Sequence, residues 1–387
     1  MTNSRSSVRT WYLVHKWSSL ICMVFMLMLC ITGLPLIFHA EIDELTRPTQ
    51  LSTDVDPDAR ASLDHIVKQA RAEKPGWPLI FLAWNEDEPI VRAILGPTMK
   101  AGEGEAHIIS YDTRTGERIM TPPSNEGVMY FILDLHGSML MGLPGALFLG
   151  VMGLLLVVSV VSGIVVYAPF MRKLAFSTVR RERGPRAKWL DIHNVTGIVT
   201  VIWLLVVCIS GIILTLIKPI TGVWQRDQLA AIAAPYHGMP LVEHPVSLDS
   251  VMATVYKEVP DADVSFVSWP GSPYATPHHF TVALRGDTPL TERLITIAMV
   301  DAESAELTTL EKTPWYLTVV NLSVPLHFGD YGSWPLKIIW ALLDIAAIVT
   351  LWSGIYLWLR RPPVRLPNTV GVEPGRQPTL PLKEAKP

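Results

Sequence analysis

Four of the eleven histidines stand at matched distances from small-residue pairs, a pattern that could hold a metal cofactor. The spacing from a histidine to the glycine of its pair takes only two values. One is shared by His15 with Thr32-Gly33 and His193 with Ser210-Gly211, the other by His136 with Ser162-Gly163 and His327 with Ser353-Gly354. Imidazole nitrogens are good axial ligands for haem iron. A flat macrocycle also needs walls without bulk, and glycine permits that approach.

Four apolar runs must position these residues. Each is long enough to cross a bilayer, which needs about 20 helical residues: roughly 18–38, 144–170, 195–217 and 336–359. Arginine and lysine dominate the loop between the second and third runs, and Arg360-Arg361 ends the fourth. By the positive-inside rule these parts and the N-terminus are cytoplasmic. The two long polar segments then face the other side, which is the periplasm of a bacterial inner membrane.

The two polar segments, about 40–135 and 218–326, show signs of a duplication. Ser62-Leu63-Asp64 of the first recurs in the second as Ser247-Leu248-Asp249, and in both a proline and a tryptophan follow at equal spacing. Each segment reads as a helix followed by alternating strands. The sequence therefore predicts two α+β domains and, with the matched histidine spacings, two parallel copies of one helix–domain–helix unit.

A parallel duplication places equivalent residues face to face around an axis along the membrane normal. His15 would then meet His193 near the cytoplasm, and His136 would meet His327 near the periplasm. Each pair could ligate one b-type haem, so two haems are expected in the bundle. Each helix would offer a ligand to one haem and a glycine gap to the other: Gly33, Gly163, Gly211 and Gly354.

The prediction is a membrane α-helical protein with four transmembrane helices in two parallel repeats and two periplasmic α+β domains. Its parts are the N-terminus with the first helix (1–39), the first periplasmic domain (40–135), the second helix (136–170), the basic cytoplasmic loop (171–191), the third helix (192–217), the second periplasmic domain (218–326), the fourth helix (327–360) and a disordered cytoplasmic tail (361–387).

Simpler interpretations exist for each feature alone. A histidine at the membrane edge is often only an interfacial residue, and small residues in membrane helices usually serve packing. The matched set favours haem over both. A metal-ion site is a weaker alternative, because each pair supplies two imidazoles and no carboxylate partner is obvious. Asp134 and Asp191 precede His136 and His193 by two residues and are either their hydrogen-bond partners or helix-start residues.

Other polar residues carry less specific signals. Asp344 lies inside the fourth apolar run, where an ionisable residue is costly and indicates function; it could pass a proton, bind a quinol or only bond a neighbouring helix. Lys337 is expected to extend toward the membrane edge. The remaining histidines are expected on surfaces or loops, although the last two could touch a substrate: His39, His65, His107, His237, His244, His278 and His279. The three cysteines form no c-type haem motif.

The chain resembles the PepSY-associated transmembrane family in three segments: DLHGS at 134–138, PLHFG at 325–329 and SGIYLWLRR at 353–361. The resemblance covers nearly the whole chain up to Arg361. It implies histidine-bearing helices that flank periplasmic PepSY-type domains, a link to iron–siderophore uptake, and reduction of a ferric siderophore at the periplasmic face.

The resulting hypothesis is a haem-dependent ferric-siderophore reductase that passes electrons from the His15–His193 haem to the His136–His327 haem. Siderophores bind iron through hard oxygen donors that suit Fe(III) better than Fe(II), so reduction would release the metal. The chain shows no nicotinamide or flavin motif, so the donor is expected to be a cytoplasmic reductase or a membrane quinol. The alternatives are a permease for intact ferric siderophore or haem, and a non-enzymatic PepSY-type binding or regulatory protein. The chain has no long basic stretch, so nucleic acid is not expected as a partner.

Overall fold

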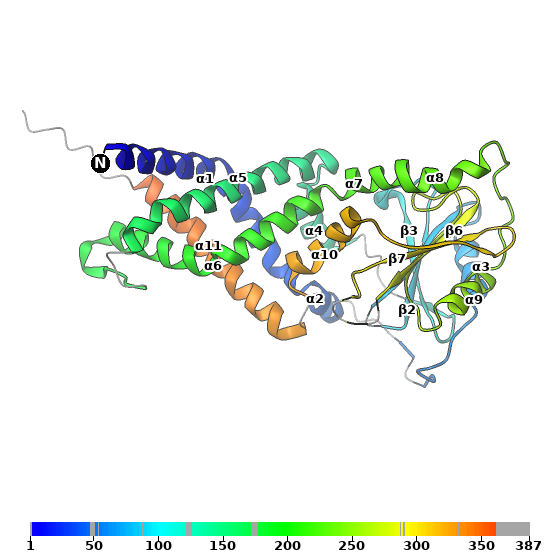
Figure 1. The fold of residues 1–387 in the computed structure, drawn as a ribbon. Coiled ribbons are helices and arrows are strands. Elements are labelled where there is room, and N and C mark those ends of the chain that lie inside the picture. Colours follow the sequence, from blue (N-terminus) through cyan, green and yellow to red (C-terminus); the bar gives the residue numbers. More distant parts are fainter. Residues whose placement is uncertain are drawn as a thin grey trace, which may run out of the picture.

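The structure is a computed structural model, and Figure 1 shows a helical bundle at one end of it and a β-sheet at the other. It describes residues 2–46, 51–52, 54–86, 88–120, 126–171, 177–286, 288, 291–330 and 333–360. The predicted tail lies outside these residues.

Four long helices form the bundle and correspond to the four apolar runs. Each is long and apolar enough to cross a membrane: α1 (Thr2–Ile37), α5 (Leu143–Met171), α6 (Pro185–Thr215) and α11 (Ser333–Leu359). Helix α1 packs against α5 and α11, and α6 packs against the same two helices. Small residues permit this approach; a Cβ added at Gly150 would lie 2.7 Å from Thr215 Oγ1. The predicted membrane-protein class is thereby confirmed.

Two short helices precede α5 and α11 and carry His136 and His327: α4 (Val128–Ser138) and α10 (Trp315–Phe328). The sequence predicted one continuous helix from each histidine into the membrane, and this is wrong. The residue that follows α4 is Met139, with φ 54°, and the residue that follows α10 is Gly329, with φ 76°. A residue in the left-handed conformation ends a helix because the next backbone N–H leaves the helical path. Each histidine therefore lies on a separate element.

The polar segments form one antiparallel sheet of eight strands in the order β4-β3-β2-β1-β5-β6-β7-β8. Its strands are β1 (Leu79–Trp84), β2 (Ile90–Leu95), β3 (His107–Asp112), β4 (Arg118–Ile119), β5 (Asp263–Ser268), β6 (His279–Arg285), β7 (Thr296–Asp301) and β8 (Leu307–Lys312). Each segment contributes four strands, and β1 pairs with β5 through Phe81 and Ser268. The segments that the sequence treated as two domains thus share a single sheet.

Two helices cover one face of the sheet: α3 (Leu63–Glu73) and α9 (Leu248–Glu258). Their N-termini cap each other. Asp249 Oδ1 accepts from the Leu63 N–H at 2.9 Å, and Asp64 Oδ1 accepts from the Leu248 N–H at 2.7 Å. The recurring Ser-Leu-Asp motif therefore supplies both a local serine cap and a cap for the partner helix.

Alternation along β7 gives the sheet two packed faces. Ala298 and Val300 join the core under α3 and α9, whereas Met299 packs on Trp224. Trp224 ends α7 (Ile217–Trp224), the first part of a helical extension of α6 that runs toward the sheet. The extension continues as a π-helical turn (Gln225–Leu229) and α8 (Ala230–Ala233). A further short helix, α2 (His39–Thr46), follows α1. The bundle and the sheet are therefore linked by packed helices.

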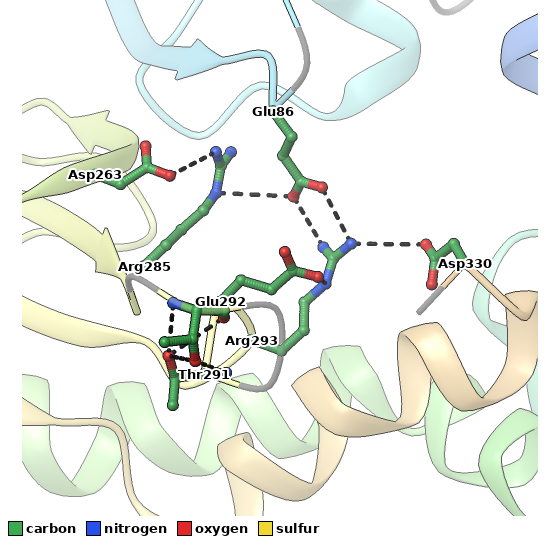
Figure 2. A network of polar contacts seen from close by, with 8 residues as sticks. Glu86, Asp263, Arg285, Thr291, Glu292, Arg293 and Asp330 are labelled. Atoms are coloured by element: carbon green, nitrogen blue, oxygen red, sulfur yellow. Dashed lines mark hydrogen bonds and ion pairs between the residues drawn. The ribbon is translucent and has the colours of Figure 1, made fainter. Parts of the chain in front are cut away.

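A charged network also ties the sheet to the loop between α10 and α11 (Figure 2). Arg293 binds both carboxylate oxygens of Glu86, at 2.9 and 3.1 Å, and lies 3.6 Å from Asp330. Arg285 lies 3.7 Å from the same Glu86 and 3.7 Å from Asp263. Because Asp330 follows His327 by three residues, this network reaches from the sheet almost to a predicted ligand.

Candidate functional site

His15 of α1 and His193 of α6 face each other at one end of the bundle. Their ring centroids lie 6.4 Å apart. His15 Nδ1 lies 2.8 Å from the Ser159 carbonyl oxygen of α5, and His193 Nδ1 lies 3.0 Å from the Thr350 carbonyl oxygen of α11. A carbonyl oxygen only accepts, so each Nδ1 carries the proton and donates it. This leaves Nε2 of both rings as the nitrogen available to a metal.

His136 and His327 form the second pair, near the sheet, with ring centroids 6.1 Å apart. His327 Nδ1 donates to the Val207 carbonyl oxygen of α6 at 2.9 Å. His136 Nδ1 lies 2.9 Å from the Thr32 hydroxyl of α1, which itself donates to the Met28 carbonyl. The hydroxyl oxygen therefore accepts from His136, and Nε2 is again the free nitrogen.

Both separations fit two imidazoles on one metal atom. Metal–imidazole bonds are about 2 Å long, and a ring nitrogen lies about 1 Å from its centroid, so the two centroids of such a pair stand roughly 6 Å apart. Within the described residues, no group of three or more His, Cys, Asp or Glu side chains could hold a bare metal ion. Two imidazoles suffice for haem iron, because the porphyrin supplies the other four nitrogens.

The four predicted glycines lie against the histidines. A Cβ added at each glycine would approach Cε1 of one histidine ring: 3.3 Å for Gly33 and His136, 3.0 Å for Gly163 and His15, 2.9 Å for Gly211 and His327, and 3.6 Å for Gly354 and His193. The sequence assigned these glycines to the face of a macrocycle. In the structure each glycine instead lies against an imidazole ring, and the absence of a side chain leaves the space that this ring occupies. We call each of these contacts a glycine seat.

Three of the four glycine seats share one construction. The carbonyl that accepts from a histidine belongs to the residue four positions before the glycine, as in Ser159 and Gly163, Thr350 and Gly354, and Val207 and Gly211. Sequence reasoning missed these carbonyls because any residue type can provide one. The signal that could have found them is the helical period, which puts positions i and i+4 on one face.

One cavity of about 1470 Å³ runs through the bundle and is lined by all four histidines. A site for a single small ligand usually has roughly 300–1,000 Å³. Most of the lining side chains are apolar, although Asp344 also faces the cavity and is only 4% exposed. The space is therefore suited to more than one bulky apolar cofactor.

Within the described residues, Asp134 and Asp191 make hydrogen bonds with residues other than the histidines that they precede. Asp191 lies inside α6 and pairs with Arg180, with Oδ1 2.7 Å from Nη2. Asp134 accepts from the Ser138 hydroxyl one turn later. Lys337, expected to extend toward the membrane edge, has its Nζ 2.6 Å from Oε1 of Glu41, which lies in α2 beyond the end of α1.

His278 and His279 were expected on a surface or loop: His278 does lie in the turn before β6, whereas His279 lies in β6, and both are buried. Their exposed fractions are 6% and 0%. Tyr236 stacks on His278 with ring centroids 5.0 Å apart, and His279 Nδ1 lies 2.6 Å from Thr276 Oγ1. Burial lowers the pKa of His279. These two histidines are part of the domain interior.

A family model described as the PepSY-associated TM region matches residues 12–361. The chain belongs to the PepSY-associated transmembrane family. The matched residues of this PepSY-associated chain include all four paired histidines and all four glycines. An uncharacterized protein of Pseudomonas aeruginosa, PA4219, is 23% identical over 256 residues, which cover 59% of this chain and 63% of that protein. The PepSY-associated chain therefore spans less than two thirds of this relative's length.

Proposed function

We propose that this chain is a two-haem electron conduit of the bacterial inner membrane that reduces a ferric siderophore at its periplasmic side. The observation that carries the proposal is the pair of facing histidine couples, 6.4 and 6.1 Å between centroids, in one cavity. A b-type haem bound by each couple would supply reversible one-electron chemistry.

The protein's part is to hold and orient the imidazoles. A ligand histidine that donates its other N–H is fixed in tautomer and ring orientation, and its metal-binding nitrogen becomes more basic. His15, His193 and His327 donate to main-chain carbonyls, and His136 donates to the Thr32 hydroxyl. The glycines let these rings lie close to the facing helix. The seats thus favour neutral imidazoles with Nε2 free.

The two couples lie near opposite ends of the bundle. His15 of α1 contacts Gly163 at one end, and Gly33, much further along α1, contacts His136 at the other. The helical stretch from His15 to Gly33 rises about 27 Å, which is close to the roughly 30 Å of a bilayer core. Two haems at these positions would carry electrons over most of the membrane thickness.

The charge distribution supports one orientation. Basic residues crowd the connection between α5 and α6 and its continuation into α6: Arg180, Arg181, Arg183, Arg186 and Lys188. The positive-inside rule makes this end cytoplasmic, with both termini, and makes the sheet periplasmic. The His136–His327 couple then lies on the side where a ferric siderophore would be reduced. The reciprocal caps of α3 and α9 support the parallel repeat that this arrangement assumes.

The substrate part of the proposal is tested by re-oxidation. Detergent-purified protein would be reduced with dithionite, freed of reductant and mixed anaerobically with a ferric hydroxamate siderophore and a ferrous-specific chelator. We expect the haem absorption bands to return to the oxidised form while one Fe(II) appears for each haem that is oxidised. His327→Ala is the matched variant, because it should keep the cytoplasmic haem and lose this reaction. A haem-loaded protein that transfers no electron to any ferric siderophore would contradict the substrate assignment. It would not contradict the proposal that the two haems conduct electrons.

A further inference from the structure

Three buried polar atoms inside the bundle lack a hydrogen-bond partner in the described part of the chain. They are Nε1 of Trp203, Nε1 of Trp340 and Oδ2 of Asp344. All three residues line the cavity that holds the histidine couples. Buried polar groups in proteins are nearly always hydrogen-bonded. Three unpaired atoms in one cavity therefore indicate a ligand that the chain itself does not provide.

Trp203 lies on α6, and Trp340 and Asp344 lie on α11. The indole rings of Trp203 and Trp340 meet edge to face, with centroids 6.5 Å apart. Asp344 follows Trp340 by four residues, so both lie on one face of α11. Trp203 and Asp344 are 8% and 4% exposed, and they form the enclosed part of the group.

The group lies between the two couples and close to the second. Trp203 stands ten residues after His193 and eight before Gly211 on α6, which is about halfway along the helix between the two couples. The Trp340 ring packs on Gly329, where an added Cβ would lie 2.5 Å from the ring. Gly329 follows His327 by two residues. A ligand bound here would be a neighbour of the His136–His327 site.

The chemistry of the three atoms restricts the ligand. Both indole N–H groups donate only, and the carboxyl oxygen of Asp344 can accept. The titratable group that contacts Asp344 is the Cys30 thiol of α1, and Cys208 of α6 lies near that thiol. An anionic ligand is disfavoured beside a carboxyl group in apolar surroundings. The ligand is therefore expected to be neutral and lipid-soluble, to accept from the indoles and to share a hydrogen bond with the Asp344 carboxyl group.

We propose that Trp203, Trp340 and Asp344 bind the head group of a membrane quinol. Each hydroxyl of a quinol accepts one hydrogen bond and donates another, and its flat ring fits beside the indoles. The need for such a donor rests on the proposed function, because the chain shows no nicotinamide or flavin motif. The position differs from the cytoplasmic entry expected from sequence, since it lies between the couples.

The test is quinol binding by the full chain in detergent, prepared both with and without haem. The probes are a short-tailed benzoquinol and a short-tailed naphthoquinol under anaerobic conditions, measured by equilibrium dialysis. Saturable binding of one probe per chain is expected. Trp203→Phe, Trp340→Phe and Asp344→Leu should each weaken binding about tenfold, the effect of one lost hydrogen bond. Trp352→Phe is the matched control, because Trp352 lies on the same helix and is 56% exposed.

Two outcomes would overturn the site: neither probe binds saturably, or the Phe and Leu variants bind as tightly as the wild type. The proposed function fails separately, because it requires haem. A chain that binds quinol but takes up no haem when expressed with ample haem would keep the site and contradict the conduit. A haem-loaded chain that binds no quinol would contradict the site and leave the conduit proposal standing.

Discussion

His136 and His327 face each other at 6.1 Å although neither lies on a long helix of the bundle. Each is carried by a short helix and seated on a different long one, His136 against Gly33 of α1 and His327 against Gly211 of α6. The distance between His136 and His327 therefore depends on how α4 and α10 pack against the long helices. Changes in that packing, or in the neighbouring sheet, should alter this distance.

The glycine seats should be intolerant of a methyl group. In Gly211→Ala, the new Cβ would lie 2.9 Å from His327 Cε1, closer than real contacts allow, so the ring must move. We expect loss or weakening of the periplasmic haem only, seen as about half the haem per chain by pyridine haemochrome. Gly222→Ala is the control, since its Cβ would meet no atom within 4 Å. Unchanged haem content in Gly211→Ala would contradict the seat.

The reciprocal caps predict a crossed effect. Asp249→Ala removes the acceptor for the Leu63 N–H of α3, although Asp249 itself lies in α9. Loss of such a cap costs about 1 kcal/mol. Amide hydrogen exchange should accelerate in the first turn of α3, in the other half of the domain. Accelerated exchange confined to α9 would show that the caps act only locally. So would an acceleration in α3 no larger than that caused by Asp261→Ala, a substitution at an exposed aspartate.

Acid should weaken the sheet through Asp112. The side-chain hydrogen bond from Arg114 holds the pKa of this buried carboxyl below its ordinary value. A lowered native pKa contributes stability above the unfolded pKa, about 3.9 for Asp, that is lost as pH falls through the native value. Denaturant unfolding followed by tryptophan fluorescence should show this loss below about pH 4. The Asp112→Asn variant should lose less stability over that range; an equal loss would assign the acid sensitivity elsewhere.

Arg293 should influence the second couple from the sheet. It joins Glu86 to Asp330, three residues after His327, as Figure 2 shows. We expect Arg293→Ala to alter the electron paramagnetic resonance signal of the His136–His327 haem and leave the other unchanged. Arg293→Lys should restore it only in part, because an ammonium cannot bind a carboxylate in bidentate fashion. Equal changes in both signals would indicate general loosening.

The sequence predicted what depends on local pattern. Apolar runs gave the four long helices, and the Ile66, Val67 and Ala70 stripe gave a helix that does bury these residues. It also paired the histidines correctly, because matched spacing reflects matched depth. The break before α5 was missed because Met139 adopts a left-handed conformation without being glycine, and the break at Gly329 before α11 was also missed. The shared sheet was missed as well, because the pairing of β1 with β5 joins residues far apart in the chain.

The most direct test of the central claim is haem content across paired histidine variants of the purified protein. Wild type should hold two b-type haems. The double variant His15→Ala with His193→Ala should hold one, because both ligands belong to the same couple. The double variant His15→Ala with His327→Ala should hold none, since it breaks both couples. Equal haem loss in the two double variants, or a colourless wild type expressed with ample haem, would contradict the two-couple account.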